Sequence, residues 1–342
     1  MAWINQEDIA RACGVSVMTV SRALRGQRGV LPEVVARVRL TAKKLGYRPD
    51  PLLSALVAHR LSRRPRSAFS VVACITHFET ENAWRDNHVT AQAYEGASRR
   101  GAEMGFSIQN FWFPGYTARR ANLSRILANR GIRGLLLGPL PSPDVEFALE
   151  WDKFSVVAIG YTASRFGFSF VASHHSQSLS LIFEEIRQLG YRRPALFFNP
   201  WADERSLHQL SGAWYYEMQQ VPPRERLPIV RLKERPSPAK VRAWIDRHRP
   251  DVIIDTFSPD LPIIRGTGLY APDDIGYVNT NVKSTASEIA GIFQNFPAMG
   301  AVAIERLSIL MNKGETGIPK LHEGSITYGT WCPGRTVRTG LV

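Results

Sequence analysis

Short apolar segments alternate with segments of helical period along residues 68–342, and this alternation restricts the folds open to the chain. The apolar segments read as buried strands at 69–76, 134–137, 156–159, 195–198, 252–254 and 275–278. Helical period occurs at 88–104, 119–130, 177–189, 207–219, 239–248 and 298–311. Repeated strand–helix units predict doubly wound parallel sheets, and the length of this region predicts two such lobes.

The positive charge of the chain is concentrated in its first fifth. Residues 1–67 hold 13 Lys and Arg against 4 Asp and Glu, whereas the remainder holds 30 against 26. A small basic module joined to a nearly neutral body is typical of a nucleic-acid binder. The alternative is a solvated basic tail, but apolar residues recur in this segment at helical spacing, as a packed domain requires.

Other features of the sequence narrow its class. No apolar run approaches the ~20 residues of a membrane span, and the first residues lack the order of a signal peptide. Cys13, Cys74 and Cys332 lie too far apart in sequence for a metal clip, and they provide no disulfide framework. We expect a cytoplasmic protein that does not associate with a membrane.

Two short helices joined by a glycine turn are predicted at the N-terminus. Asn5 with Asp8 three residues later is the signature of a capped helix start, and that helix runs to about Ala12. Gly14 can adopt the positive φ of a tight turn, and Ser16 can cap a second helix that ends near Leu24. This arrangement is a helix-turn-helix.

The second helix has one face for the core and one for DNA. Val20, Ala23 and Leu24 are expected to face inward. The outward face then carries Val17, Met18, Ser21 and Arg22. An arginine there suits bidentate contact with guanine, and the apolar pair suits thymine methyl groups. The alternative for Arg22 is simple solvation.

These segments resemble a known family. Asp8-Ile9-Ala10, Gly14-Val15-Ser16, Thr19-Val20-Ser21-Arg22 and 45–49 match the DNA-binding headpiece of the lactose/galactose repressor (LacI/GalR) family in order, spacing and position. The resemblance implies a third helix, Pro32 to about Leu45, and a homodimer that reads an inverted-repeat operator in double-stranded DNA. Leu31 departs from the family because it cannot cap that helix with its side chain. The DNA-binding residues are expected to be Asn5, Ser16, Val17, Met18, Thr19, Ser21, Arg22 and Leu56.

The headpiece is assigned to residues 1–49, and residues 50–67 follow it as a hinge helix and linker. Asp50-Pro51 predicts a short helix to about Arg60. The resemblance implies that Leu56 is an apolar wedge in the minor groove of the operator, where such side chains kink DNA. The alternative is that the hinge helices only pack against each other in the dimer.

The body, residues 68–342, resembles the core shared with periplasmic sugar-binding proteins, in which an effector lies between two lobes. Segments 189–193, 272–276 and 329–336 carry this resemblance. Ligands of open α/β sheets bind beyond the carboxyl ends of the strands. The candidate effector residues at strand ends are His77, Phe78, Trp201, Asp203, Gln209, Asp255 and Asn281. Several polar positions differ from the sugar-binding members, so ordinary packing of these residues, or the absence of an effector, stays open.

Catalysis and metal binding have little support in the sequence. His174 and His175 are adjacent, and neighbouring side chains seldom share one ion. The place of a phosphate loop reads Thr76-His77-Phe78-Glu79-Thr80-Glu81, and other catalytic motifs are absent. We therefore expect neither metal nor cofactor. An α/β enzyme with an incidental basic N-terminus is the remote alternative, as is a nucleoid-type architectural protein.

The sequence as a whole predicts a transcriptional regulator, in the first instance a repressor. It would bind its operator as a dimer under the control of a carbohydrate-related small molecule. DNA binding without small-molecule control is the alternative. The sequence leaves open the operator, the effector, repression or activation, and whether the effector releases DNA or promotes its binding.

Overall fold

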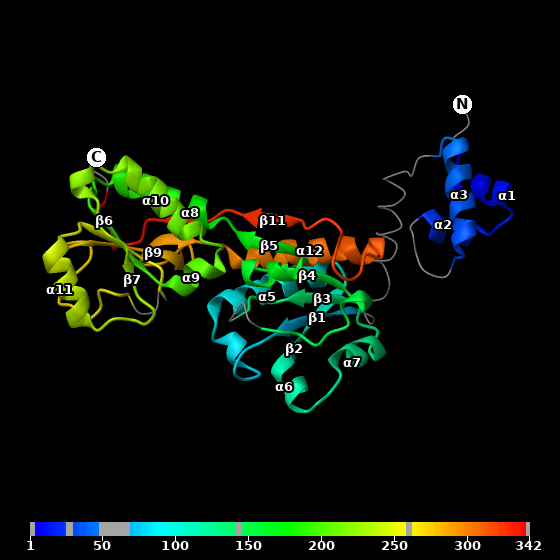
Figure 1. The fold of residues 1–342 in the computed structure, drawn as a ribbon, viewed down its shortest axis with the longest axis horizontal. Helices are drawn as coiled ribbons and strands as arrows, with labels where there is room; N and C mark the ends of the chain where they lie inside the picture. Colours follow the sequence, from blue (N-terminus) through cyan, green and yellow to red (C-terminus); the bar gives the residue numbers. More distant parts are fainter. Residues whose placement is uncertain (1–3, 25–29, 48–68, 141–144, 258–261, 340–342) are drawn as a thin grey trace.

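A computed structural model describes residues 4–24, 30–47, 69–140, 145–257 and 262–339 of the chain (Figure 1). They form a small helical headpiece and two α/β lobes. The predicted fold class, a helix-turn-helix headpiece followed by two lobes of doubly wound sheet, is confirmed.

The headpiece is a three-helix unit with its own core. Its helices are α1 (Gln6–Cys13), α2 (Val17–Leu24) and α3 (Pro32–Lys44). Each helix is too short to be stable alone in water, so packing must hold them. The buried residues that do this are Ile9, Ala10, Cys13, Val20, Ala23, Val38 and Ala42.

The first lobe is built on a parallel six-stranded sheet in the order β11-β5-β4-β3-β1-β2. Its strands are β1 (Ser70–Thr76), β2 (Phe106–Trp112), β3 (Gly134–Leu137), β4 (Ser155–Ile159), β5 (Ser169–Ser173) and β11 (Gly324–Thr327). Its helices include α5 (His88–Glu103), α6 (Phe113–Ala118) and α7 (Leu123–Asn129). Strands β3 and β4 are buried along their whole length, as expected for a sheet covered on both faces.

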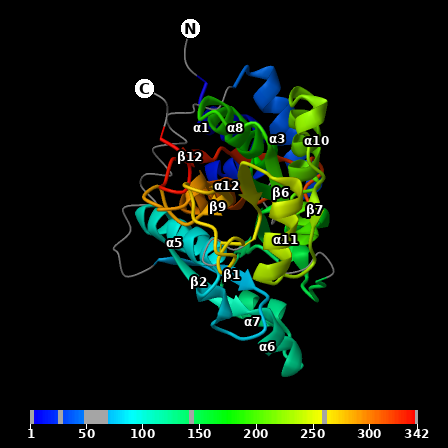
Figure 2. The same ribbon diagram turned by 90° about the vertical axis from the view of Figure 1, so that its left-hand side faces the viewer.

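The second lobe has a six-stranded sheet in the order β12-β10-β9-β8-β6-β7, in which only the β10–β12 pair is antiparallel. The strands are β6 (Pro194–Phe198), β7 (Val230–Arg231), β8 (Val252–Asp255), β9 (Gly276–Val282), β10 (Ala290–Phe293) and β12 (Thr330–Cys332). The helices of this part of the chain are α8 (His175–Gln188), α9 (Pro200–Arg205), α10 (Gln209–Gln220) and α11 (Pro238–His248). Figure 2 shows α8 and α10 on one face of the sheet and α11 on the other.

The chain crosses between the two lobes three times: from β5 to α8, from β10 to α12 (Phe296–Lys313), and from β11 to β12. Helix α12 follows a strand of the second lobe but packs against α5 and the first sheet (Figure 1). Glycines allow the close approach of α5 and α12. A Cβ on Gly96 would overlap the Pro297 carbonyl, and one on Gly300 would overlap the Ala93 carbonyl. The lobes are therefore connected through a tightly packed helix pair.

The structure corrects several element boundaries. The helix expected over 119–130 is α7, which begins at Leu123, after a separate short helix α6. Strands β2, β5, β7, β10, β11 and β12 are not among the predicted strands, and four of them, β2, β7, β11 and β12, lie at sheet edges. Strand β2 lies at the sheet edge, where its exposed Gln109 and half-buried Asn110 interrupt the apolar pattern. Edge strands are only partly buried, so their sequences carry a weak signal.

Candidate DNA interface and effector site

Helix α1 begins as its sequence predicts. The Asn5 side chain accepts hydrogen bonds from the backbone N–H groups of Glu7 (2.8 Å) and Asp8 (3.0 Å). The Asp8 carboxylate accepts the Asn5 N–H at 2.9 Å, which completes a capping box. Gly14 ends the helix at φ 63°, a conformation that other residues rarely adopt. These bonds fix the angle at which α2 leaves the turn.

Helix α2 separates its side chains as predicted. Val20 and Ala23 are buried, and Leu24 is half-buried. Val17, Met18 and Arg22 are exposed on the opposite side, where they leave an uncovered strip along α2. The expected base contacts of this strip remain predictions.

The polar residues of α2 have structural partners of their own. The Ser16 Oγ accepts the Thr19 N–H at 3.1 Å and lies 2.8 Å from Thr19 Oγ1, so Ser16 caps the helix. Ser21 is half-buried. DNA contacts of Ser16, Thr19 and Ser21 remain predictions, as does any contact of the capping residue Asn5.

Helix α3 starts without a side-chain cap at Leu31, in agreement with the sequence. The Gln6 amide donates a 3.1 Å hydrogen bond to the Tyr47 hydroxyl, which connects α1 to the end of the headpiece. Leu56, the predicted hinge helix and the 63–66 basic run lie outside the described residues.

His77 and Phe78 follow β1, at the carboxyl edge of the first sheet. The His77 ring lies 6.2 Å from the Phe113 ring and 6.0 Å from the Phe147 ring, and burial lowers its pKa. The Phe78 carbonyl accepts a 2.8 Å hydrogen bond from Trp112 Nε1. The side chains of His77 and Phe78 are both half-buried. At this sheet edge His77 therefore offers an imidazole ring that packs beside two phenylalanine rings.

Two predicted effector contacts have hydrogen-bond partners within the second lobe. Asp255 is fully buried, and its carboxylate accepts hydrogen bonds from the Tyr277 hydroxyl (2.5 Å) and the backbone N–H groups of Phe257 and Ile263. Burial raises its pKa to about 6. The Asp255 carboxylate is therefore used within the second lobe, and an effector contact of Asp255 remains a prediction.

Asp203 is the second such residue. It is buried, and its carboxylate accepts the Ser211 N–H (2.9 Å) and the Ser211 hydroxyl (2.8 Å). It also lies 3.0 Å from His208 Nδ1. These bonds hold the turn between α9 and α10, where Leu207 and His208 have positive φ. Asp203 thus has a structural use in this turn, and an effector contact of Asp203 remains a prediction.

The other three candidates in the second lobe retain accessible or unused groups. Trp201 is 46% exposed at the start of α9. Gln209 is half-buried, and its backbone carbonyl accepts the Ser176 hydroxyl of α8. Asn281, near the end of β9, has a buried Oδ1 without a hydrogen-bond partner. Of these three residues, Asn281 alone presents a buried polar atom without a partner.

Sequence reasoning missed two residues of this region. The sequence indicates His175 only as half of a possible metal pair, yet the residue is half-buried and its buried Nδ1 has no hydrogen-bond partner. Arg205 received no role, although it is a mostly buried cation at the end of α9. The adjacent histidines were the one signal available, since burial of an arginine depends on the tertiary fold.

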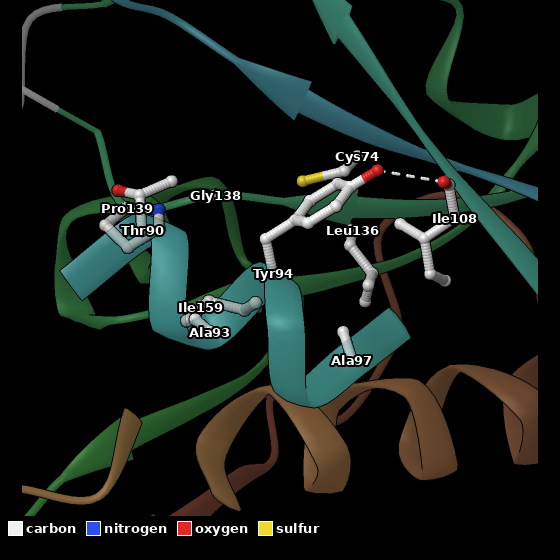
Figure 3. A pocket seen from close by; sticks show the side chains of 10 residues that line it. All are labelled: Cys74, Thr90, Ala93, Tyr94, Ala97, Ile108, Leu136, Gly138, Pro139 and Ile159. Atoms are coloured by element: carbon white, nitrogen blue, oxygen red, sulfur yellow. Dashed lines mark hydrogen bonds between the residues drawn. The ribbon is translucent and has the colours of Figure 1, made fainter. Parts of the chain in front are cut away.

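Two cavities lie away from these strand ends. One, of about 10 Å³, is enclosed between α5 and the first sheet beside Cys74 and Tyr94, and it is hardly larger than a water molecule (Figure 3). Burial raises the pKa of the Cys74 thiol to about 12. The other, of about 280 Å³, adjoins Pro194, which begins β6, so it lies at the amino edge of the second sheet. Neither is at the place predicted for an effector.

No cluster of His, Cys, Asp and Glu suited to a metal ion occurs among the described residues. Within the same ranges, no helix is both long and apolar enough to cross a bilayer.

The described residues combine a helix-turn-helix headpiece with two α/β lobes of periplasmic-binding-protein-like fold. Residues 6–50 match the model of the lacI family of bacterial regulatory proteins. The predicted resemblance of the headpiece to the lactose/galactose repressor family is thus confirmed over these residues.

Two curated relatives are transcriptional regulators and not enzymes. The HTH-type transcriptional regulator GntR of Pseudomonas aeruginosa is 45% identical over 51 residues, which are 15% of each chain. The HTH-type transcriptional regulator MalR of Streptococcus pneumoniae serotype 4 is 25% identical over 162 residues, 47% of this chain and 46% of that one. The chain thus spans about half or less of the curated relatives it matches.

Solved structures share the fold over almost the whole chain. A lac repressor dimer bound to operator and the anti-inducer ONPF superimposes with a TM-score of 0.57 at 17% identity, covering 99% of this chain and 100% of that one. A complex of the transcriptional regulator CelR with cellobiose gives 0.54 at 19% identity, covering 97% and 99%. These likenesses establish the fold of both lobes.

Proposed function

We propose that the protein is a cytoplasmic transcriptional regulator that binds an inverted-repeat operator as a homodimer, most simply as a repressor. The observation that carries the proposal is the exposed strip of α2, Val17, Met18 and Arg22, in a headpiece of LacI-family sequence. Recognition helices present such side chains to the major groove. The lac repressor in the related structure is a dimer bound to operator, which supports the same arrangement here.

The test is DNase footprinting on DNA flanking the gene, with the full-length protein. We expect one protected inverted repeat whose half-sites are related by the dimer axis. The Arg22→Ala variant should lose protection, whereas the control Arg119→Ala, at an exposed position after α6, should retain it. Absence of any protected inverted repeat would refute the proposal.

Control by a small molecule between the lobes is the second part of the proposal. Related structures contain cellobiose or D-xylulofuranose. A thermal-shift screen of sugars, uronates, nucleosides and sugar phosphates, followed by operator titration with each hit, tests it. DNA binding without an effector is the competing function, favoured by the structural use of Asp203 and Asp255. The competing function would be supported if none of the screened compounds altered operator affinity.

A further inference from the structure

Arg205 is a partly buried cation that the protein leaves without a counter-charge. It ends α9, the short helix after β6, and most of its side chain is buried. Among the residues that the structure describes, none forms a hydrogen bond or an ion pair with its guanidinium. The nearby Asp203 carboxylate is occupied by Ser211 and His208, and burial lowers the pKa of Arg205. Removing a charge from water lowers the stability of the fold unless an opposite charge or hydrogen-bond partner compensates it.

His175 is the neighbour of Arg205 and is also incompletely satisfied. Burial first, and then the charges of Arg205 and His174, lower its pKa to about 4, so the ring is neutral near pH 7. Its buried Nδ1 has no partner. Its ring lies 6.0 Å from that of Tyr161, which follows β4 in the first lobe. The pair therefore lies beside the carboxyl edge of the first sheet, where a ligand between the lobes would bind.

Two unpaired acceptors occur on the same side of the second lobe. Gln177, in the first turn of α8, has a buried Oε1 without a partner, as Asn281 has its Oδ1. In the sheet, Phe197 of β6 is level with Asp255 of β8, which is level with Asn279 of β9. Two residues further along, Asn281 is therefore level with Asn199, the residue that caps α9. Most buried polar atoms of proteins have partners, which makes this set unusual.

We propose that the effector is a polyhydroxylated carboxylate, a sugar acid, whose carboxylate pairs with Arg205 and hydrogen-bonds to His175, while its hydroxyl groups donate to Gln177 and Asn281. This rests on the proposed control by a small molecule. One buried cation neutralises one negative charge, which favours a carboxylate over a doubly charged phosphate ester. Unpaired acceptors require donors, which a hydroxylated skeleton supplies and a simple fatty acid does not.

The first test needs no knowledge of the effector. Replacement of Arg205 by Met keeps an unbranched apolar side chain of similar length to the aliphatic part of arginine and removes the charged guanidinium group. Without ligand, Arg205→Met should melt about 2–4 °C higher than wild type, because an uncompensated buried charge has gone. The control Arg119→Met, at an exposed position, should be unchanged. A lower melting temperature in Arg205→Met would show that the arginine stabilises the ligand-free fold, and would overturn the proposal.

The second test probes the anion directly on the full-length protein. Sodium acetate should raise the melting temperature of wild type above that in sodium chloride of equal ionic strength, and should not do so for Arg205→Met. No acetate-specific shift in wild type would overturn the proposal. D-gluconate and D-galacturonate should bind wild type roughly 10–100-fold more tightly than D-glucose and D-galactose, as charge-assisted hydrogen bonds imply, and Arg205→Met should abolish the preference.

The outcomes separate this inference from effector control itself. If neutral sugars bind wild type and Arg205→Met equally and change operator affinity, control by a small molecule stands and the sugar-acid assignment fails. Tighter binding of glucose 6-phosphate than of either sugar acid would also overturn the carboxylate. If acetate and the sugar acids bind as expected but leave operator affinity unchanged, the site is correct and the regulatory function fails.

Discussion

The hydrogen bond between Tyr277 and Asp255 allows a quantitative test of the second lobe. The hydroxyl donates to the carboxylate at 2.5 Å, and both side chains are fully buried. The Asp255 pKa is about 6, raised by burial and held down in part by this bond. Tyr277→Phe removes the donor. Near pH 7.5 Asp255 is ionised, and losing a hydrogen bond to a charged group should cost about 1.5–3 kcal/mol of unfolding free energy.

The same substitution should cost less in acid. Near pH 5 Asp255 is protonated in the folded protein, and a bond between neutral groups contributes only about 0.5–1.5 kcal/mol. The raised pKa also has a consequence for wild type: the folded state holds a proton that the unfolded state releases above its pKa of 3.8, so stability from this group falls as pH rises from about 4 to 6. In Tyr277→Phe the Asp255 pKa should rise further, which extends this fall to higher pH.

The assay is urea unfolding at about pH 5 and about pH 7.5, followed by circular dichroism. The control is Tyr270→Phe, because Tyr270 is 72% exposed and its hydroxyl should contribute little at either pH. An equal loss of stability at the two pH values, or a larger loss in acid, would refute the assignment of a carboxylate that ionises while buried against Tyr277.

Three further predictions concern packing and DNA. Gly300→Ala should lower the unfolding free energy by about 1–3 kcal/mol because its Cβ would overlap the Ala93 carbonyl. The control Gly212→Ala should not lower it, since there is open space around Gly212 in α10. Thermal unfolding that is unchanged in Gly300→Ala would argue against the α5–α12 contact. Arg22→Ala should cost about 1–3 kcal/mol on the operator and relax preference at one base pair, and equal losses on random duplexes in a gel-shift titration would contradict base contact. Leu56→Ala should reduce operator bending, measured by circular-permutation mobility; an unchanged bend would favour a hinge that only joins the subunits.

Local rules predicted the headpiece well because its structure depends on near neighbours. Asn5 with Asp8, Gly14, and Ser16 with Thr19 each act within a few residues, through capping bonds or a required backbone angle. The buried and exposed faces of α2 followed from spacing alone. The hydrogen bond between Gln6 and Tyr47 joins residues that are 41 positions apart, so it could not be predicted in this way.

The effector candidates show where sequence reasoning fails. Asp255 lies at a strand end as expected, but its carboxylate also accepts hydrogen bonds from the backbone N–H groups of residues 257 and 263, and such partners cannot be predicted from local sequence. Arg205 appeared to be one more arginine in a basic chain. Its burial and its nearness to His175 result from α8 and α9 meeting, 30 residues apart in sequence, which no periodicity reveals.

The last two strands of the chain have a consequence for how the protein is made. Strand β11 completes the edge of the first sheet, and β12, three residues later, completes that of the second. Helix α12, which covers the first sheet, is also translated only after β10. A ribosome must therefore release residues up to Thr327 before the first lobe can close and up to about Cys332 before the second can, so a message truncated before β11 should yield two unfinished sheets and not one finished lobe.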